Sequence, residues 1–309
     1  MCIRDRPWTD SVTTALKQAD YIIVTNPKRL NLFYGAQQAD INRLYAAMAQ
    51  LAYLKRGVVG FVDAYCFTAL DTLLATTWAN QLHPDFKSGA PGGYVLLVGE
   101  SEIIPAWYED SFNVEWSDGG KTTSVAYSDL PYASIVGQDK HPELAVGRIV
   151  GNSPAALLKP IETSIAIAEG WPGYRFDRSH ALIVSGRGIG VESTFIPTVN
   201  IIDGVLRGQG TDVTKIHWKY NNTPSYTYVF TDATPNQDIV YFFGHGNVGV
   251  WGPGLSTGLT NVWPLNFNGS NPFVYGTTCL SGGYEENAES MPEYFFASGA
   301  GAYILSLIH

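Results

Sequence analysis

The sequence is poor in cysteine and in charged residues. Of its 309 residues only three are cysteines, Cys2, Cys66 and Cys279, and 15% are charged, with 28 acidic residues against 19 basic ones. Three cysteines without His or Cys neighbours at ligand spacing form neither a disulfide framework nor a zinc pattern. A formal charge of −9 with no basic stripe argues against a nucleic-acid partner.

Long apolar runs are absent as well. No stretch approaches the roughly 18 residues that a membrane-spanning helix needs, and no apolar segment follows the first residues as in a signal peptide. Residues 1–6 and 305–309 resemble translated sequencing-adaptor read-through, so we exclude them from the fold and expect a fragment truncated at both ends. For a fragment, the absence of a signal peptide does not indicate whether the protein is exported.

Two series of strands and helices make up the rest of the chain. Short, continuously apolar strands alternate with amphipathic helices, which indicates parallel sheets covered on both faces. A Gly-Asn-Ser-Pro boundary at 151–154 separates the two series. We predict an α/β protein with two α/β/α subdomains and mainly parallel sheets, residues 7–150 and residues 151–304. The expected strands are 21–24, 58–62, 94–99, 181–185, 213–216, 239–243, 273–277 and 302–304, and the expected helices are 37–55, 68–82, 153–169, 196–207 and 292–297.

Reactive residues follow two strands of the second subdomain. Strand 239–243 leads into His245, and strand 273–277 leads into Cys279. Ligands of open parallel sheets bind outside the carboxyl ends of the strands, so both residues reach one edge if the strands are neighbours. The imidazole then takes the thiol proton during attack, or the pair rests as thiolate and imidazolium. The backbone N–H groups of Gly246 and Cys279 are the candidate oxyanion hole.

The residue types alone are also compatible with purely structural roles for Cys279 and His245. A cysteine at a strand end is commonly a small buried hydrophobe, and a histidine between glycines can simply cap a turn. Residue types therefore indicate a Cys–His pair without establishing one.

Ordered motifs along residues 20–304 narrow the choice. The chain resembles the gingipain (C25) cysteine peptidases in its second half and in the segment that links its two subdomains. The matching segments are Phe242-Phe243-Gly244-His245-Gly246-Asn247, Val274-Tyr275-Gly276-Thr277-Thr278-Cys279 with Gly282, Pro292-Glu293-Tyr294, Gly299–Ile304, Tyr94–Val98 with Ile104-Pro105, Ser128–Tyr132, Gly137-Gln138-Asp139 and Pro142–Arg148.

This resemblance implies a caspase-like second subdomain, a related non-catalytic first subdomain and endopeptidase activity on proteins or peptides. It also implies export by a bacterium, as a secreted or cell-surface enzyme that requires no cofactor. An acidic residue after the first catalytic strand can orient the histidine in this family. Glu192 is the only acid of the loop 186–193, although a solvated loop acid is the simpler reading of this residue. Family members often bind structural calcium, for which Asp129 and Asp139 are candidate ligands.

Two other functions remain open on the sequence. Some relatives act as sortase-like transpeptidases of a bacterial secretion system, which pass the acyl group to an amine instead of water. A degenerate domain that only binds at a surface is the third reading, and the retention of both His245 and Cys279 speaks against it. The P1 preference and the oligomeric state have no signal in the sequence.

Overall fold

The computed structural model describes much of the chain, which divides into two compact units, Met1–Ile161 and Glu162–His309. The boundary falls inside helix α6 (Pro154–Glu169), so a division at residues 150 and 151 stays a prediction. The predicted helix at 68–82 lies outside the described residues. These are 19–63, 93–115, 121–134, 142–186, 192–218, 226–252, 255–256, 265–284 and 289–306.

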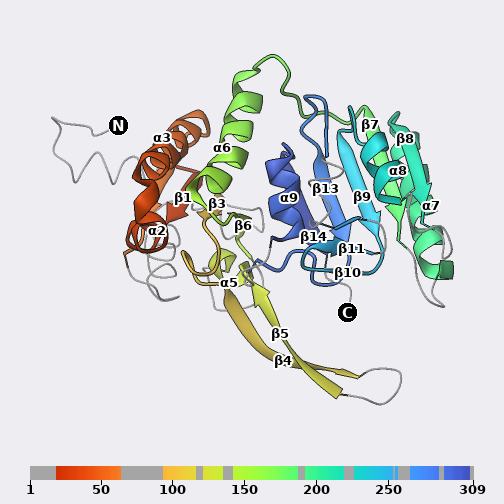
Figure 1. Ribbon diagram of the computed structural model, residues 1–309, viewed down its shortest axis with the longest axis horizontal. Helices are drawn as coiled ribbons and strands as arrows, with labels where there is room; N and C mark the ends of the chain where they lie inside the picture. Colours follow the sequence, from red (N-terminus) through yellow and green to blue (C-terminus); the bar gives the residue numbers. More distant parts are fainter. Residues whose placement is uncertain are drawn as a thin grey trace. The chain divides into compact units, whose positions relative to one another are not determined.

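The first unit is built on a four-stranded parallel sheet with the order β2-β1-β3-β6 (Figure 1). Its central strands are continuously apolar, as strands buried on both faces require. Helices α2 and α3 follow β1, and Asn26 caps α2 by accepting the Arg29 N–H at 3.1 Å. The elements are β1 (Tyr21–Thr25), α2 (Pro27–Tyr34), the 3₁₀ turn η1 (Gly35–Gln37), α3 (Gln38–Leu54), β2 (Val58–Phe61), β3 (Gly93–Val98) and β6 (Leu144–Ile149).

Between β3 and β6 the chain forms an antiparallel pair, which the sequence did not lead us to expect. Strands β4 (Trp107–Glu115) and β5 (Lys121–Ser128) pair with an irregularity between Glu109 and Phe112. The short helix α5 (Leu130–Ala133) follows them. The predicted parallel character therefore holds for the main sheet of this unit and not for the hairpin.

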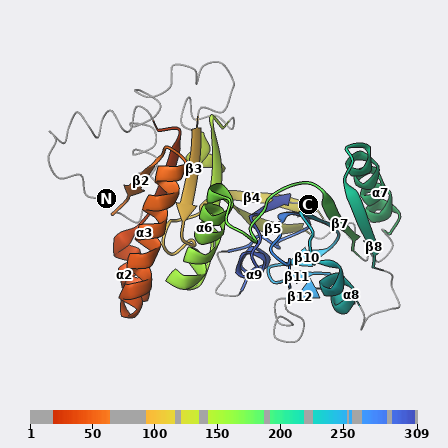
Figure 2. The same ribbon diagram turned by 90° about the horizontal axis from the view of Figure 1, so that it is seen from above.

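The second unit holds a five-stranded parallel sheet with the order β14-β13-β9-β7-β8. Helix α7 covers one face, where Phe195 and Val199 pack on β7 and β9. Helices α8 and α9 belong to the other face (Figure 2). Phe230 of α8 and Phe295 of α9 contact the ring of Trp251. The strands are β7 (His180–Ser185), β8 (Asp212–His217), β9 (Ile239–Phe243), β13 (Phe273–Thr277) and β14 (Ala302–Ser306), and the helices are α7 (Glu192–Gly208), α8 (Tyr226–Ala233) and α9 (Met291–Ala297).

A small antiparallel sheet follows β9. It consists of β10 (Gly246–Asn247), β11 (Val250–Trp251) and β12 (Leu255–Ser256), and none of these was predicted. Helix α7 begins at Glu192, four residues before the predicted start, so Glu192 opens a helix where we expected a loop. The overall prediction of an α/β protein with mainly parallel sheets is confirmed.

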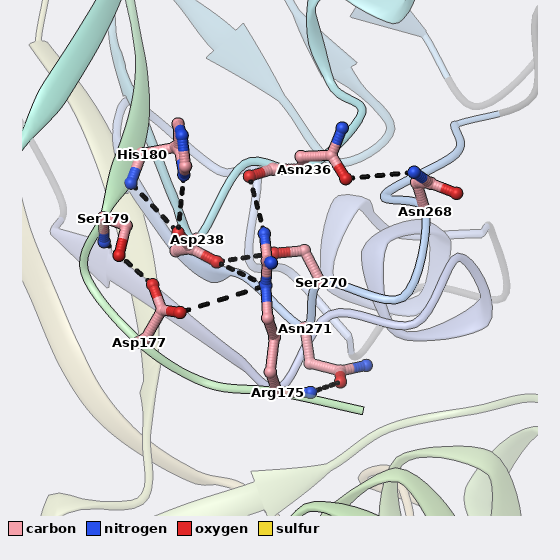
Figure 3. Close-up of polar contacts among 9 residues, drawn as sticks. All are labelled: Arg175, Asp177, Ser179, His180, Asn236, Asp238, Asn268, Ser270 and Asn271. Atoms are coloured by element: carbon pink, nitrogen blue, oxygen red, sulfur yellow. Dashed lines mark hydrogen bonds and ion pairs between the residues drawn. The ribbon is translucent and has the colours of Figure 1, made fainter. Parts of the chain in front are cut away.

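A polar cluster fixes the amino edge of the second sheet (Figure 3). The carboxylate of Asp238 lies just before β9 and is fully buried; it accepts the Ser270 hydroxyl at 2.6 Å and the His180 N–H at 2.9 Å. The Arg175 guanidinium lies 3.4 Å from this carboxylate and 3.9 Å from Asp177. Segments that precede β7, β9 and β13 are thus joined at one charged group, at the edge opposite to His245 and Cys279.

Among the described residues, no helix is both long enough and apolar enough to cross a membrane.

Candidate active site

Strands β9 and β13 are direct neighbours, and each leads into one of the two candidate catalytic residues. Their parallel register pairs Phe243 with Thr277. His245 and Cys279 therefore each follow two residues after a paired position, at the same carboxyl edge of the sheet. The Gly244 N–H donates to the Thr277 carbonyl at 3.2 Å, which continues the contact between the two chain segments past the ends of the strands.

The backbone next to His245 lies against the backbone next to Cys279. A Cβ atom added to Gly246 would lie 2.1 Å from the Thr278 Oγ1, 2.9 Å from the Val250 carbonyl oxygen and 3.1 Å from the Cys279 carbonyl oxygen. Two of these neighbours are backbone atoms that cannot turn away. Only glycine at position 246 lets the two loops approach this closely.

His245 is held from two sides, although its side chain is exposed. Its carbonyl oxygen accepts the Gly252 N–H at 2.8 Å, which ties it to the hairpin of β10 and β11. Its ring stands edge-on to Phe195 of α7, with 5.3 Å between ring centroids and 83° between the planes. Packing on Phe195 restricts the rotamers of the His245 side chain. Less side-chain conformational entropy is therefore lost when the imidazole forms a hydrogen bond with a thiol.

Cys279 is half-buried and is followed by a strained residue. Leu280 has a positive φ of 51°, a left-handed backbone that costs a non-glycine residue about 1–2 kcal/mol. The Gly283 N–H closes the turn by donating to the Leu280 carbonyl at 2.9 Å. Burial raises the pKa of the Cys279 thiol. The resting site therefore favours a neutral thiol that loses its proton during attack over a standing thiolate.

The pH dependence of alkylation distinguishes these two resting states. Because burial disfavours the charged thiolate, the iodoacetamide reaction of Cys279 should rise at a higher pH than that of an ordinary thiol, whose pKa is about 8.5. The rate is measured by mass spectrometry of the peptide that carries Cys279. The same peptide in the chain unfolded with guanidinium chloride is the control. A native midpoint below the unfolded one indicates a preformed thiolate–imidazolium pair instead.

The candidate oxyanion donors have distinct surroundings. Gly246 faces Trp251 across the β10–β11 ladder, and the bond from Gly252 N–H to the His245 carbonyl flanks this pair. Because hydrogen-bonded and non-hydrogen-bonded pairs alternate in an antiparallel ladder, the Gly246 N–H is directed away from Trp251. It is therefore not committed to that ladder. The role of the Cys279 N–H as the second donor stays a prediction.

Glu192 lies at the first residue of α7, three residues before Phe195. The helix that begins there packs on His245 through Phe195, so Glu192 belongs to the element next to the imidazole. Its side chain lies outside the described residues, and its role as an orienting acid stays a prediction.

Asp129, one of the two candidate calcium ligands, is bound by an arginine side chain. Both oxygens of Asp129 accept from the Arg148 guanidinium, from Nε at 2.8 Å and from Nη2 at 2.6 Å. The other Arg148 donor group bonds the carbonyls of Gly99 and Ile104. In the part of the chain that is described, no three His, Cys, Asp or Glu side chains are grouped to hold a metal ion. Asp139 lies outside that part, and structural calcium stays a prediction.

Some residues of the edge were not found by sequence reasoning. Ser185 at the end of β7 is fully buried, and its Oγ lies 2.7 Å from Nδ1 of His217 at the end of β8. Its burial excludes it as a nucleophile. Trp251, Ser281 and Tyr303 meet beside the Cys279 turn, and no sequence motif would have grouped them.

Comparison with known proteins agrees with an α/β sheet that carries Cys and His at its carboxyl edge. The family model described as "Peptidase family C25" matches residues 14–306. The chain therefore belongs to peptidase family C25, a family of cysteine peptidases.

Individual relatives are distant. The chain is 27% identical to Gingipain R2 of Porphyromonas gingivalis (strain ATCC 33277) over 204 residues, covering 64% of this chain and 25% of that protein. It is also 27% identical to Gingipain R1 of Porphyromonas gingivalis over 204 residues, covering 64% of this chain and 19% of that protein. The matched region thus spans a quarter or less of these two relatives.

Solved structures share the fold. The crystal structure of the Arg-specific cysteine proteinase gingipain R (RGPB) aligns with a TM-score of 0.61 and 19% identity, over 91% of this chain and 59% of that one. A complex of the Porphyromonas gingivalis RgpB pro- and mature domains aligns with a TM-score of 0.64 and 19% identity, over 94% and 64%. At this identity the likeness establishes the fold, which is caspase-like.

Proposed function

We propose that this chain is the catalytic part of a cysteine endopeptidase in which Cys279 is the nucleophile and His245 the general base. The observation that carries the proposal is the close contact of the two loops at Gly246, on neighbouring strands of one sheet. Membership in peptidase family C25 supports it. Its expected substrates are proteins or peptides, and it requires no cofactor. Action outside the bacterial cell, secreted or at the surface, is part of the same proposal.

The chemistry is an acyl transfer in two halves. The Cys279 sulfur attacks the peptide carbonyl carbon while His245 takes the thiol proton. The carbonyl oxygen becomes an oxyanion that accepts from the N–H groups of Gly246 and Cys279, where one such donor is typically worth about 3 kcal/mol. The C–N bond breaks as His245 returns the proton to the leaving amine. Water then attacks the thioester, His245 takes its proton, and the acid product leaves with the thiol restored.

If the Cys279 thiol is neutral at rest, His245 must act as the general base during attack. Since burial raises the pKa of Cys279, little thiolate exists at neutral pH before substrate binds. The proton must therefore move to the imidazole during attack, which requires His245 within hydrogen-bond reach in the substrate complex. Glu192 at the start of α7 is proposed to orient that imidazole.

An electrophilic peptide probe tests the proposal. A peptidyl acyloxymethyl ketone should label the wild-type chain on the peptide that contains Cys279, as located by mass spectrometry. His245→Ala should label far more slowly, by about 10²–10⁴-fold for loss of a general base. His83→Ala, a change in the sequence of the other unit, is the matched control and should label normally. Labelling at Cys66, or equal labelling of the His245 variant, contradicts the proposal.

The acceptor of the acyl group is decided by the products. Hydrolysis of a peptide substrate leaves a free carboxylate, whereas transpeptidation in the presence of an amine leaves an amide of different mass. We expect the carboxylate to dominate. A dominant amide product identifies the sortase-like alternative, and no product from a broad peptide library identifies the degenerate binding module.

A further inference from the structure

A buried hydrogen-bonded chain runs beside the candidate active site. The hydroxyl of Tyr303 on β14 accepts the indole Nε1–H of Trp251 at 3.3 Å and lies 3.0 Å from the Ser281 hydroxyl. Trp251 and Ser281 have no measurable exposure. Three segments that are distant in sequence therefore meet at one oxygen.

The space for this oxygen is provided by a glycine of the β13 motif. A Cβ atom on Gly276 would lie 2.9 Å from the Tyr303 hydroxyl and 3.4 Å from the Trp251 ring. Any side chain at position 276 would push the hydroxyl out of place. Tyr303 is half-buried overall, but its hydroxyl end is enclosed by Gly276, Trp251 and Ser281. Burial raises its pKa strongly, so the hydroxyl keeps its proton and remains a donor.

One end of the chain belongs to the histidine loop. Trp251 of β11 pairs with Gly246 of β10, and the next residue, Gly252, donates to the His245 carbonyl. The Trp251 ring stacks on Phe242 of β9 with 4.6 Å between centroids and 7° between planes. Fixing Trp251 therefore fixes the backbone that presents the imidazole.

The other end belongs to the cysteine turn. Ser281 lies two residues after Cys279, inside the turn that Gly283 closes onto Leu280. Leu280 is held in a left-handed conformation, which persists only where the surrounding structure enforces it. The Ser281 hydroxyl is the side-chain anchor that ties this turn to β14.

We propose that Tyr303 is a positioning residue of the active site: its single hydroxyl joins the loop of His245 to the turn of Cys279 and sets their relative placement. The inference rests on the proposed function for its catalytic meaning. Trp251 and Ser281 act through the same oxygen. Removing the Tyr303 hydroxyl and removing the Ser281 hydroxyl should therefore have largely the same effect on the active site, and the two effects should not add.

Tyr303→Phe removes only the hydroxyl, and it should change two reactions in opposite directions. Acylation by the electrophilic peptide probe should slow by about tenfold to a hundredfold, because a displacement near 1 Å at the reacting atoms costs up to that factor. Iodoacetamide alkylation of Cys279 at fixed pH should become several-fold faster. The loosened turn exposes the thiol and relieves the burial that raises its pKa.

Two further variants probe the same oxygen from other sides. Ser281→Ala should reproduce both shifts, and the double variant should be little worse than either single one. Tyr132→Phe is the matched control: Tyr132 is buried in the other unit and donates to the Pro105 carbonyl at 2.6 Å. It loses a comparable hydrogen bond but should leave both rates of Cys279 unchanged. All rates are measured well below the unfolding midpoint, per folded molecule.

Each outcome decides the inference. Opposite shifts in Tyr303→Phe and Ser281→Ala, absent in Tyr132→Phe, support it. Unchanged rates, shifts of equal sign, or multiplicative effects in the double variant overturn it. If Tyr303→Phe does not fold, Ser281→Ala decides alone. If the wild type takes no probe at Cys279, the proposed function fails, and the alkylation rates still decide whether this oxygen holds the turn.

Discussion

Cys279→Ala is expected to abolish acyl-enzyme formation and peptide hydrolysis while the fold persists. Without the sulfur no thioester can form, so the reaction loses its covalent route. In a serine hydrolase with a comparable nucleophile and general base, loss of the nucleophile costs on the order of 10⁶ in kcat. The half-buried thiol is small and alanine fits its site, so the unfolding midpoint should change little. The measurements are probe labelling, product formation and a denaturation curve.

Cys66→Ala is the matched control for this change. It removes a second thiol of the same sequence and should leave labelling and hydrolysis intact. Cys279→Ser tests whether the sulfur itself is required, since a hydroxyl of ordinary pKa beside His245 is a much weaker nucleophile. Undiminished labelling of the Cys279→Ala variant assigns the chemistry to another residue and rejects the proposed function.

The candidate pair was predictable because two simple patterns agree. Apolar strands such as 239–243 and 273–277 are identified by their composition, and the carboxyl edge of a parallel sheet is where their next residues emerge. Strand order is the step that sequence reasoning had to assume. In the structure β9 and β13 are adjacent, which is the condition that a Cys279–His245 pair requires.

The supporting residues were not predictable because they depend on tertiary packing. Trp251, Ser281 and Tyr303 come from three separate segments and have no common spacing. In the sequence, Gly246 and Gly276 look like ordinary turn or strand glycines. In the structure, another segment of the chain approaches each of them too closely to leave space for a side chain. Strands β10, β11 and β12 have two residues each, too short for any periodicity to identify them.

The amino edge of the same sheet illustrates a second limit. Asp238 follows a Pro-Asn-Gln run and reads as an ordinary loop acid, yet its carboxylate is fully buried. It accepts the Ser270 hydroxyl and the His180 backbone N–H, and Arg175 supplies the counter-charge. The Nδ1 of His180 also lies 3.4 Å from this carboxylate, without the alignment of a hydrogen bond (Figure 3).

Asp238→Ala is therefore expected to be the most destabilising single change at this edge, by about 2–4 kcal/mol. The substitution leaves the Ser270 hydroxyl and the His180 N–H buried without their acceptor, and unsatisfied buried groups cost more than a hydrogen bond contributes. Asp177→Ala is the matched control. Asp177 faces the same Arg175, but its side chain is 44% exposed, so its loss should cost less than about 1 kcal/mol.

Urea unfolding, followed by a signal from the second unit, measures the difference between the two aspartates. Asp238→Asn should fall between the wild type and the alanine variant, since the amide keeps an acceptor oxygen but loses the charge that faces Arg175. The polar cluster around Asp238 joins the segments that precede β7, β9 and β13. Loss of the Asp238 carboxylate should therefore destabilise all three strands together. Equal destabilisation by Asp238→Ala and Asp177→Ala would mean that burial of the carboxylate is not what holds this edge.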